Sequence, residues 1–121
     1  MPGHILILDD EESLLRLYSR LFREAGYRVD SAASLAEALR LAAARTYDLA
    51  VVDLLLGDGC GTRLVAELSR RGGTRSIIVS GSLDEPELGE LARGCGAAAY
   101  FCKPFRSAAL LAAVQAALDP A

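Results

Sequence analysis

Carboxylates end two short apolar runs of this 121-residue chain. Asp9 and Asp10 follow the first run, His4–Leu8, and Asp53 ends the second, Leu49–Asp53. Clustered carboxylates repel one another, which raises a pKa among them unless a cation is present. Oxygen ligands without histidine suit a hard divalent ion, most plainly Mg²⁺ with several retained waters. The sequence therefore predicts a magnesium site, provided that the fold brings the ends of the two runs together.

Ser80 and Lys103 offer a hydroxyl and an ammonium group that could join these acids. Ser80 ends a third apolar run, and Lys103 directly follows a fourth. Acids, a hydroxyl and a lysine around a metal can bind a phosphoryl group, because the cations neutralise its oxygens and the hydroxyl donates a hydrogen bond. Asp53 is the candidate nucleophile, since aspartate can form an acyl phosphate. Taken singly, these residues have structural explanations as helix caps, a strand-end hydroxyl and a surface charge.

Apolar runs typical of buried strands alternate with amphipathic helical patterns along the whole chain. The predicted strands are His4–Leu8, Tyr27–Ala32, Leu49–Asp53, Ser76–Ser80 and Ala98–Cys102. The predicted helices run from about Ser13 to Ala25, from Leu35 after a capping box at Ser34 and Glu37, from Thr62 to Arg71, from Glu85 to Gly94 and from Ser107 to Leu118. Parallel neighbours need helical crossovers, so this alternation predicts an α/β fold with helices on both faces of a parallel sheet.

The predicted fold is a flavodoxin-like (βα)5 three-layer sandwich, whose central five-stranded parallel sheet has the strand order 2-1-3-4-5. The first and third strands are neighbours in this order, and ligands bind beyond the carboxyl ends of the strands. Asp9, Asp10 and Asp53 should therefore meet at one edge of the sheet, which Ser80 and Lys103 also reach.

Composition limits the class of protein. Hydrophobic residues make up 52% and charged residues 24%, which excludes a disordered chain, and the length fits one domain over residues 1–121. The net charge of -3 argues against a nucleic-acid surface. Cys60, Cys95 and Cys102 lack the spacing of a zinc site or a disulfide frame, so we expect free thiols. Neither a signal peptide nor a membrane span is visible, and a cytoplasmic location is expected.

The ordered set of these residues resembles the receiver domain of two-component response regulators over essentially the whole chain: Asp9-Asp10, Asp53, Ser80 and Lys103-Pro104-Phe105. The resemblance implies that Asp53 is the phosphoacceptor. It would take a phosphoryl group from the phosphohistidine of a sensor histidine kinase or a histidine phosphotransfer protein. Mg²⁺ would be bound by Asp10, Asp53 and the backbone carbonyl of Leu55, with Asp9 helping through water.

The resemblance also implies how the domain responds to phosphate. Ser80 would be the switch hydroxyl that holds the phosphoryl group, and Tyr100 the aromatic residue whose rotation follows; a structural alternative for Tyr100 is half-buried packing. Lys103 would pair with Asp53 and then with phosphate, and the Lys103–Pro104 peptide is expected to be cis. The face made by the last strand and the helices before and after it would then change and control an output domain or partner.

That face is rich in alanine and leucine around Ala97 to Ala99. It lacks the charged residues through which one class of DNA-binding regulators dimerises, so a phosphorylation-dependent homodimer is left open. No output domain is visible in the chain, and direct contact of this domain with nucleic acid is not expected.

The chain also departs from the usual receiver pattern. Gly57 stands where receivers usually have proline, and with Gly59 and Gly61 it predicts a loop more mobile than usual. Leu55 and Ser82 fall where side chains influence attack of water on the acyl phosphate. Because leucine cannot orient water, we expect slow self-dephosphorylation.

Three alternatives compete with a phosphorylated receiver. A degenerate receiver would act by docking without phosphorylation. An aspartyl-phosphate phosphatase of the haloacid dehalogenase type would need a second acid two positions after Asp53, where Leu55 stands, and a cap for which the chain has no room. A flavodoxin-like cofactor binder would have its phosphate repelled by the acids that follow the first strand. The receiver itself is expected to catalyse its own phosphorylation and slow dephosphorylation without being a turnover enzyme.

Overall fold

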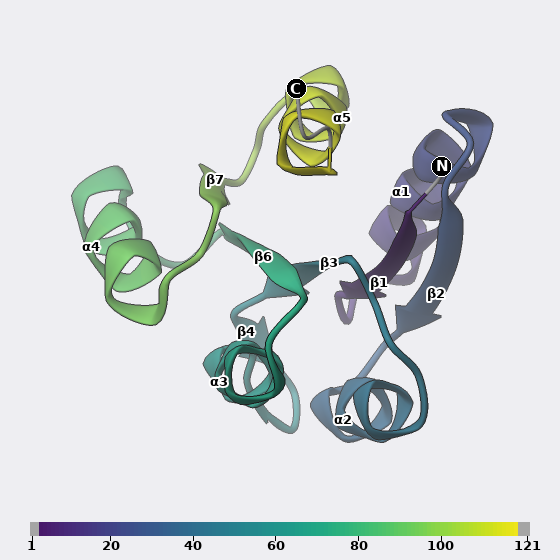
Figure 1. The fold of residues 1–121 in the computed structure, drawn as a ribbon. Helices are drawn as coiled ribbons and strands as arrows, with labels where there is room; N and C mark the ends of the chain where they lie inside the picture. The colour runs from purple at the N-terminus through teal and green to yellow at the C-terminus, as the bar shows by residue number, and fades with distance from the viewer. Residues whose placement is uncertain (1–2, 119–121) are drawn as a thin grey trace.

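A parallel sheet separates two layers of helices in the computed structural model, which describes residues 3–118 (Figure 1). The strands are β1 (His4–Leu8), β2 (Arg28–Ala32), β3 (Leu49–Asp53), β4 (Leu55–Leu56), β5 (Gly59–Cys60), β6 (Arg75–Ser80) and β7 (Ala99–Cys102). The helices are α1 (Glu12–Glu24), α2 (Leu35–Ala44), α3 (Thr62–Arg71), α4 (Glu85–Cys95) and α5 (Ser107–Leu118). The ends of the predicted domain, residues 1–2 and 119–121, lie outside the described residues.

The five-stranded sheet has the order β2-β1-β3-β6-β7 with every pair parallel, which confirms the predicted order 2-1-3-4-5. Its register aligns the carboxyl ends of the strands, because Leu8 pairs with Val52 and Ser80 pairs with Cys102. The strands β4 and β5, which no pattern in the sequence predicted, form a separate antiparallel hairpin between β3 and α3. The remaining boundaries differ from the predicted ones by about one residue.

Side chains alternate between the two faces of the sheet, as expected for strands. On β1, Leu6 and Leu8 join the core beneath α2, α3 and α4, whereas Ile5 and Ile7 join the core beneath α1 and α5. All five residues of β3 are buried, as its unbroken apolar run predicts for a central strand covered on both faces. The end of β3 is therefore packed on both faces of the sheet.

The capping residues at the starts of α2 and α4 could be predicted only in part from the sequence. Ser34 accepts a hydrogen bond from the backbone N–H of Glu37 at 3.2 Å, but the Glu37 carboxylate accepts from Ala33 rather than closing the predicted capping box. A complete capping box occurs instead at the start of α4, between Asp84 and Glu87. This box defines the start of α4, which the apolar pattern alone did not fix.

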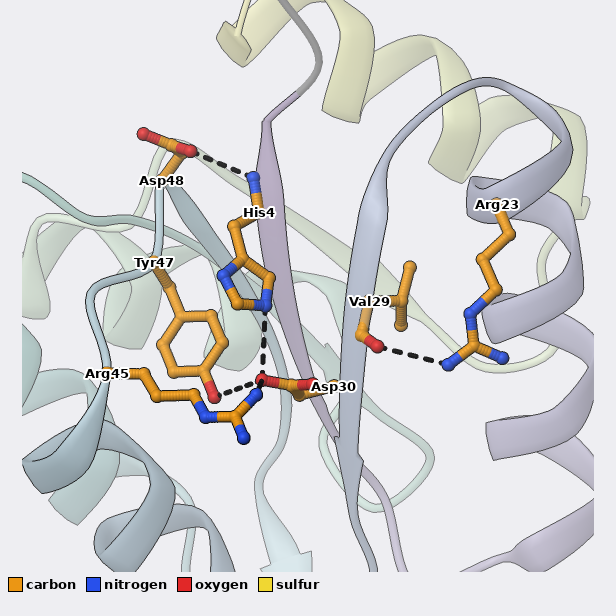
Figure 2. Close-up of polar contacts among 7 residues, drawn as sticks. All are labelled: His4, Arg23, Val29, Asp30, Arg45, Tyr47 and Asp48. Carbon is orange, nitrogen blue, oxygen red and sulfur yellow. Dashed lines mark hydrogen bonds and ion pairs between the residues drawn. The ribbon is translucent and has the colours of Figure 1, made fainter.

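A polar cluster ties the strands together at the amino-terminal edge of the sheet (Figure 2). The Asp30 carboxylate on β2 accepts a hydrogen bond from the hydroxyl of Tyr47 at 2.7 Å and from Arg45 at 3.0 Å, and His4 Nε2 lies 3.1 Å away. Burial alone would raise the pKa of Asp30, but the Tyr47 hydrogen bond and the charges of His4 and Arg45 outweigh it and hold the pKa below its usual value. This cluster joins β1, β2 and the segment before β3.

Cys60, Cys95 and Cys102 are free thiols, as predicted. Among residues 3–118, none of the helices combines the length and the apolar character that a membrane crossing requires.

Candidate functional site

Asp9, Asp10 and Asp53 meet at the carboxyl edge of the sheet, as the strand order predicts. Each contributes a carboxylate oxygen to a group whose members all lie within 4.8 Å of one another. Asp9 and Asp53 are buried, with 1% and 6% of their surface exposed, whereas Asp10 is exposed. Such a group combines two fixed oxygen donors with one that faces solvent.

Helix capping does not account for these acids. Glu11 occupies the N-cap position of α1, yet its side chain makes no capping hydrogen bond. Asp9 Oδ1 accepts a hydrogen bond from the backbone N–H of Glu11 at 2.9 Å, while its other oxygen faces Lys103. Glu12 lies in the first turn, where a negative charge favours the helix dipole. The helix dipole therefore explains Glu12. It explains Asp9 only in part, because one oxygen of Asp9 accepts a hydrogen bond at the start of α1 and the other faces Lys103.

Lys103 lies between two of the carboxylates. Its ammonium nitrogen is 3.0 Å from Asp9 Oδ2 and 3.4 Å from Asp53 Oδ2. Burial raises the pKa of Asp53, and the charges of Asp9 and Asp10 add to this, while Lys103 opposes it. Burial alone would lower the pKa of Lys103, but its hydrogen bond to Asp9 and the charge of Asp53 outweigh that and raise it. The lysine therefore stays charged beside the acids.

Ser80 reaches the same edge but is fully buried. Its hydroxyl lies 3.0 Å from the hydroxyl of Ser82 and accepts a hydrogen bond from the Ser82 backbone N–H at 3.2 Å. The backbone N–H of Lys103 donates to the Ser80 carbonyl at 2.8 Å, which fixes the end of β6 against the end of β7. The loop after β6 thus closes over Ser80.

An open pocket of about 210 Å³ joins these elements, lined by Asp10, Glu11, Asp53, Leu55, Gly81, Ser82 and Lys103. Asp9 and Ser80 lie behind this lining. Leu55 and Ser82 line the pocket together with Asp53, and Leu55 is 65% exposed. The pocket has room for a phosphoryl group with water, and its walls carry acids, one lysine and hydrogen-bond donors.

The three glycines after Asp53 have different roles. Gly61 has an ordinary helical φ of -62°, but a Cβ placed there would lie 2.1 Å from the Asp53 carbonyl oxygen. Gly59 has a φ of 152°, in the region that favours glycine, whereas nothing lies within 4 Å of a Cβ on Gly57. The sequence pattern indicated only a flexible turn, and the close approach of Gly61 required the fold.

Asp58 is a further residue of this loop with a role that was not predicted from the sequence. Its carboxylate accepts hydrogen bonds from the backbone N–H groups of Leu35 at 2.9 Å and Ala36 at 3.0 Å, which caps the start of α2. These hydrogen bonds lower the pKa of Asp58. The loop beside Asp53 is therefore anchored to another helix at its tip, and no local pattern in the sequence links the two segments.

Among the hydrogen bonds of residues 3–118, none joins Tyr100 to the Ser80 hydroxyl. Its own hydroxyl donates to the Glu85 carboxylate on α4 at 2.7 Å, and this hydrogen bond raises the pKa of Tyr100, with burial adding to it. Tyr100 therefore lies on the α4 side of β7. The Lys103–Pro104 peptide is cis, as predicted.

Comparison with known proteins settles the family. The family model described as "Response regulator receiver domain" matches residues 5–115. This chain is a receiver domain. Receivers act in two-component signal transduction, where phosphorylation is their standard signal.

Relatives of this receiver include full regulators. The acid tolerance regulatory protein ActR of Sinorhizobium medicae is 34% identical over 116 residues, which cover 91% of this chain and 57% of ActR. The regulatory protein VirG of Rhizobium rhizogenes is 30% identical over 115 residues, which cover 95% of this chain and 48% of VirG. The receiver thus spans about half the length of these relatives.

Solved structures agree with the fold. A CheY-like receiver domain protein from Methanospirillum hungatei has 31% identity and a TM-score of 0.89, covering 98% of this chain and 95% of that one. A response regulator from Burkholderia pseudomallei has 32% identity and a TM-score of 0.81, covering 93% of this chain and 66% of that one. The Burkholderia structure contains a phosphorylated aspartic acid and a calcium ion.

Proposed function

We propose that this receiver accepts a phosphoryl group on Asp53. The observation that carries the proposal is the Lys103 ammonium, which lies 3.4 Å from Asp53 Oδ2 at the wall of a pocket lined by acids. A similar structure from Burkholderia pseudomallei carries a phosphorylated aspartic acid. The phosphodonor would be a phosphohistidine on a sensor histidine kinase or a histidine phosphotransfer protein.

The carboxylate cluster fits a hard divalent ion, because its donors are oxygens and two of the three are fixed by burial. Asp10, Asp53 and the backbone carbonyl of Leu55 would hold Mg²⁺, with Asp9 acting through water. The bound ion would neutralise negative charge on the phosphoryl oxygens. The relative with a phosphorylated aspartic acid holds calcium, another ion that prefers oxygen ligands.

Transfer would proceed by attack of an Asp53 oxygen on phosphorus. The new O–P bond forms as the N–P bond to the donor imidazole breaks, and the electron pair leaves with the imidazole nitrogen. Lys103 would turn from the Asp53 carboxylate to the phosphoryl oxygens, which its charge stabilises. Gly81 would leave space for the donor, because it lines the pocket without a side chain.

The signal would spread from Ser80. Its hydroxyl would leave Ser82 and donate to a phosphoryl oxygen, and Tyr100 would rotate from Glu85 toward the space that Ser80 vacates. The surface made by α4, β7 and α5 would then change and control an output domain or partner, with homodimerisation of phosphorylated receivers as one outcome. The charge that phosphorylation adds, roughly -1.5 to -2, drives this two-state change.

The receiver would not be a turnover enzyme, because the acyl phosphate on Asp53 is expected to be hydrolysed slowly and to act as the signal rather than as a short-lived intermediate. A phosphatase reading would need an acid two positions after Asp53, and the exposed Leu55 side chain stands there. We expect the receiver to act in the cytoplasm, where free thiols persist.

Incubation with Mg²⁺ and acetyl phosphate, followed by intact mass measurement, tests the proposal. The wild-type receiver should gain the mass of one phosphoryl group, stable in acid and labile in base. Asp53→Ala, and wild type with EDTA, should gain nothing. Wild type that binds Mg²⁺ without gaining mass would instead be a degenerate receiver, and the proposal would be wrong.

A further inference from the structure

The phenol ring of Tyr100 is seated against a glycine in the middle of α4. A Cβ built on Gly89 would lie 2.9 Å from the Tyr100 hydroxyl oxygen and 3.1 Å from Cζ of the ring. The first of these is closer than a methyl group and a phenol oxygen can approach. The ring therefore occupies the space that any other residue at position 89 would fill.

Glu85 completes this seat one turn earlier in α4. Its carboxylate accepts the hydrogen bond of the Tyr100 hydroxyl at 2.7 Å. Arg93, one turn later, has a guanidinium nitrogen 3.4 Å from the Cβ position of Gly89. Two successive turns of one helix thus contact the phenol, Glu85 through its carboxylate and Gly89 through its backbone, and Arg93 on the next turn lies beside Gly89.

Gly94 shows that the seat at Gly89 is specific. Both glycines lie within α4, where glycine disfavours a helix relative to alanine. Nothing lies within 4 Å of a Cβ on Gly94, so its replacement would meet no neighbour. Gly89 is buried, and the atoms nearest to a Cβ on it belong to the side chains of Tyr100 and Arg93. The two positions therefore separate the contact with Tyr100 from the general effect of a helical glycine.

We propose that Gly89 and Glu85 form a notch on α4 that holds the Tyr100 ring and opposes its rotation toward Ser80. They are positioning residues, which set how readily the receiver switches, and this rests on the proposed function of Tyr100 as the aromatic that moves on phosphorylation. The notch stabilises one of two ring positions. By linkage, loss of the notch raises the population of the conformation that the phosphorylated receiver adopts.

Fluorine NMR of receiver labelled with 3-fluorotyrosine reads the ring position directly. The chain has four tyrosines, and Tyr100→Phe identifies the signal of Tyr100 by its disappearance. Gly89→Ala fills the notch and should shift that signal in the unphosphorylated protein, whereas the matched Gly94→Ala should not. Glu85→Ala should also shift it, and Glu85→Gln, which keeps an acceptor oxygen, should leave it near the wild-type position. A Tyr100 signal unchanged by Gly89→Ala refutes the notch.

The initial rate of phosphorylation by acetyl phosphate tests whether the notch sets how readily the receiver switches. Gly89→Ala should react roughly 2- to 10-fold faster than Gly94→Ala, which is the effect of losing about one hydrogen bond. Equal rates for the two variants would overturn the proposal even if the fluorine signal moves. Wild type that takes no phosphoryl group would refute the proposed function and the switching role together. The fluorine experiment would then still decide whether the notch holds the ring.

Discussion

Gly61 packs directly against the backbone of Asp53. A Cβ on Gly61 would lie 2.1 Å from the Asp53 carbonyl oxygen and 2.7 Å from a methyl carbon of Val52. The backbone N–H of Gly61 also donates to the Leu54 carbonyl at 2.8 Å. The turn that follows the phosphoacceptor candidate is thus folded back onto the strand that carries it, and the position of Asp53 depends on a residue without a side chain.

Gly61→Ala should lower the free energy of unfolding by about 1–3 kcal/mol or more, because the new methyl group overlaps backbone that cannot move without disturbing β3. Gly57→Ala is the matched control, since nothing lies within 4 Å of a Cβ there and its φ is not positive. Urea denaturation of the two variants measures the difference. Equal stability of the two would show that the contact with Asp53 carries no cost.

Leu55→Asn should shorten the lifetime of the phosphorylated receiver. Leu55 lines the pocket beside Asp53 and offers no group that orients water, whereas an asparagine amide can hold one for attack on phosphorus. The expected acceleration is about 2- to 10-fold, the effect of one hydrogen bond of roughly 0.5–1.5 kcal/mol. Loss of the phosphoryl mass over time measures the rate. Leu55→Ala, which removes bulk alone, should be slower than the asparagine variant; if both decay alike, orientation of water is not the reason.

Asp30→Asn should destabilise the receiver at neutral pH by roughly 1–2 kcal/mol, because the buried Tyr47 hydroxyl and Arg45 lose a charged acceptor. The pKa of Asp30 is lowered in the folded state, so its stabilisation is present above the unfolded pKa of about 3.9 and is lost as pH falls through the folded pKa. Thermal unfolding of both proteins between pH 7 and pH 2 should show the difference narrowing below about pH 4. A difference in stability that widens as the pH falls would contradict a lowered pKa of Asp30 in the folded state.

Mg²⁺ should stabilise the folded receiver, because only the folded chain brings the carboxylates of β1 and β3 together. At ten times the dissociation constant the gain is about 1.4 kcal/mol. Asp10→Asn should abolish most of the rise in melting temperature, while Glu12→Gln, in the first turn of α1 and outside the cluster, should keep it. A rise of equal size in the Asp10 variant would place the ion elsewhere.

Much of the fold could be predicted from the sequence because its signals are local. The unbroken apolar run ending at Asp53 marks a central strand, and amphipathic segments between such runs mark crossover helices. The strand order then places Asp9 and Asp10 beside Asp53 without any knowledge of side-chain contacts. The capping box at Asp84 and Glu87 was equally readable and would have fixed the start of α4.

The contacts that could not be predicted join segments with no local pattern in common. Asp58 caps α2 across 23 residues, which only the folded β4–β5 hairpin makes possible. Gly61 approaches Asp53 closely, although its φ is ordinary and a turn explains it equally well from sequence. The role of Gly89 depends on the ring of Tyr100, which packs against it from β7. In each case the decisive quantity is a distance set by packing of two elements.

Reductive trapping tests the central claim most directly. Borohydride converts an aspartyl phosphate to homoserine, and tandem mass spectrometry of the digested protein then locates the converted residue. After treatment with acetyl phosphate and Mg²⁺, we expect homoserine at position 53 alone, and none when EDTA replaces Mg²⁺. Homoserine at Asp9, Asp10 or Asp58, or none under either condition, would contradict it.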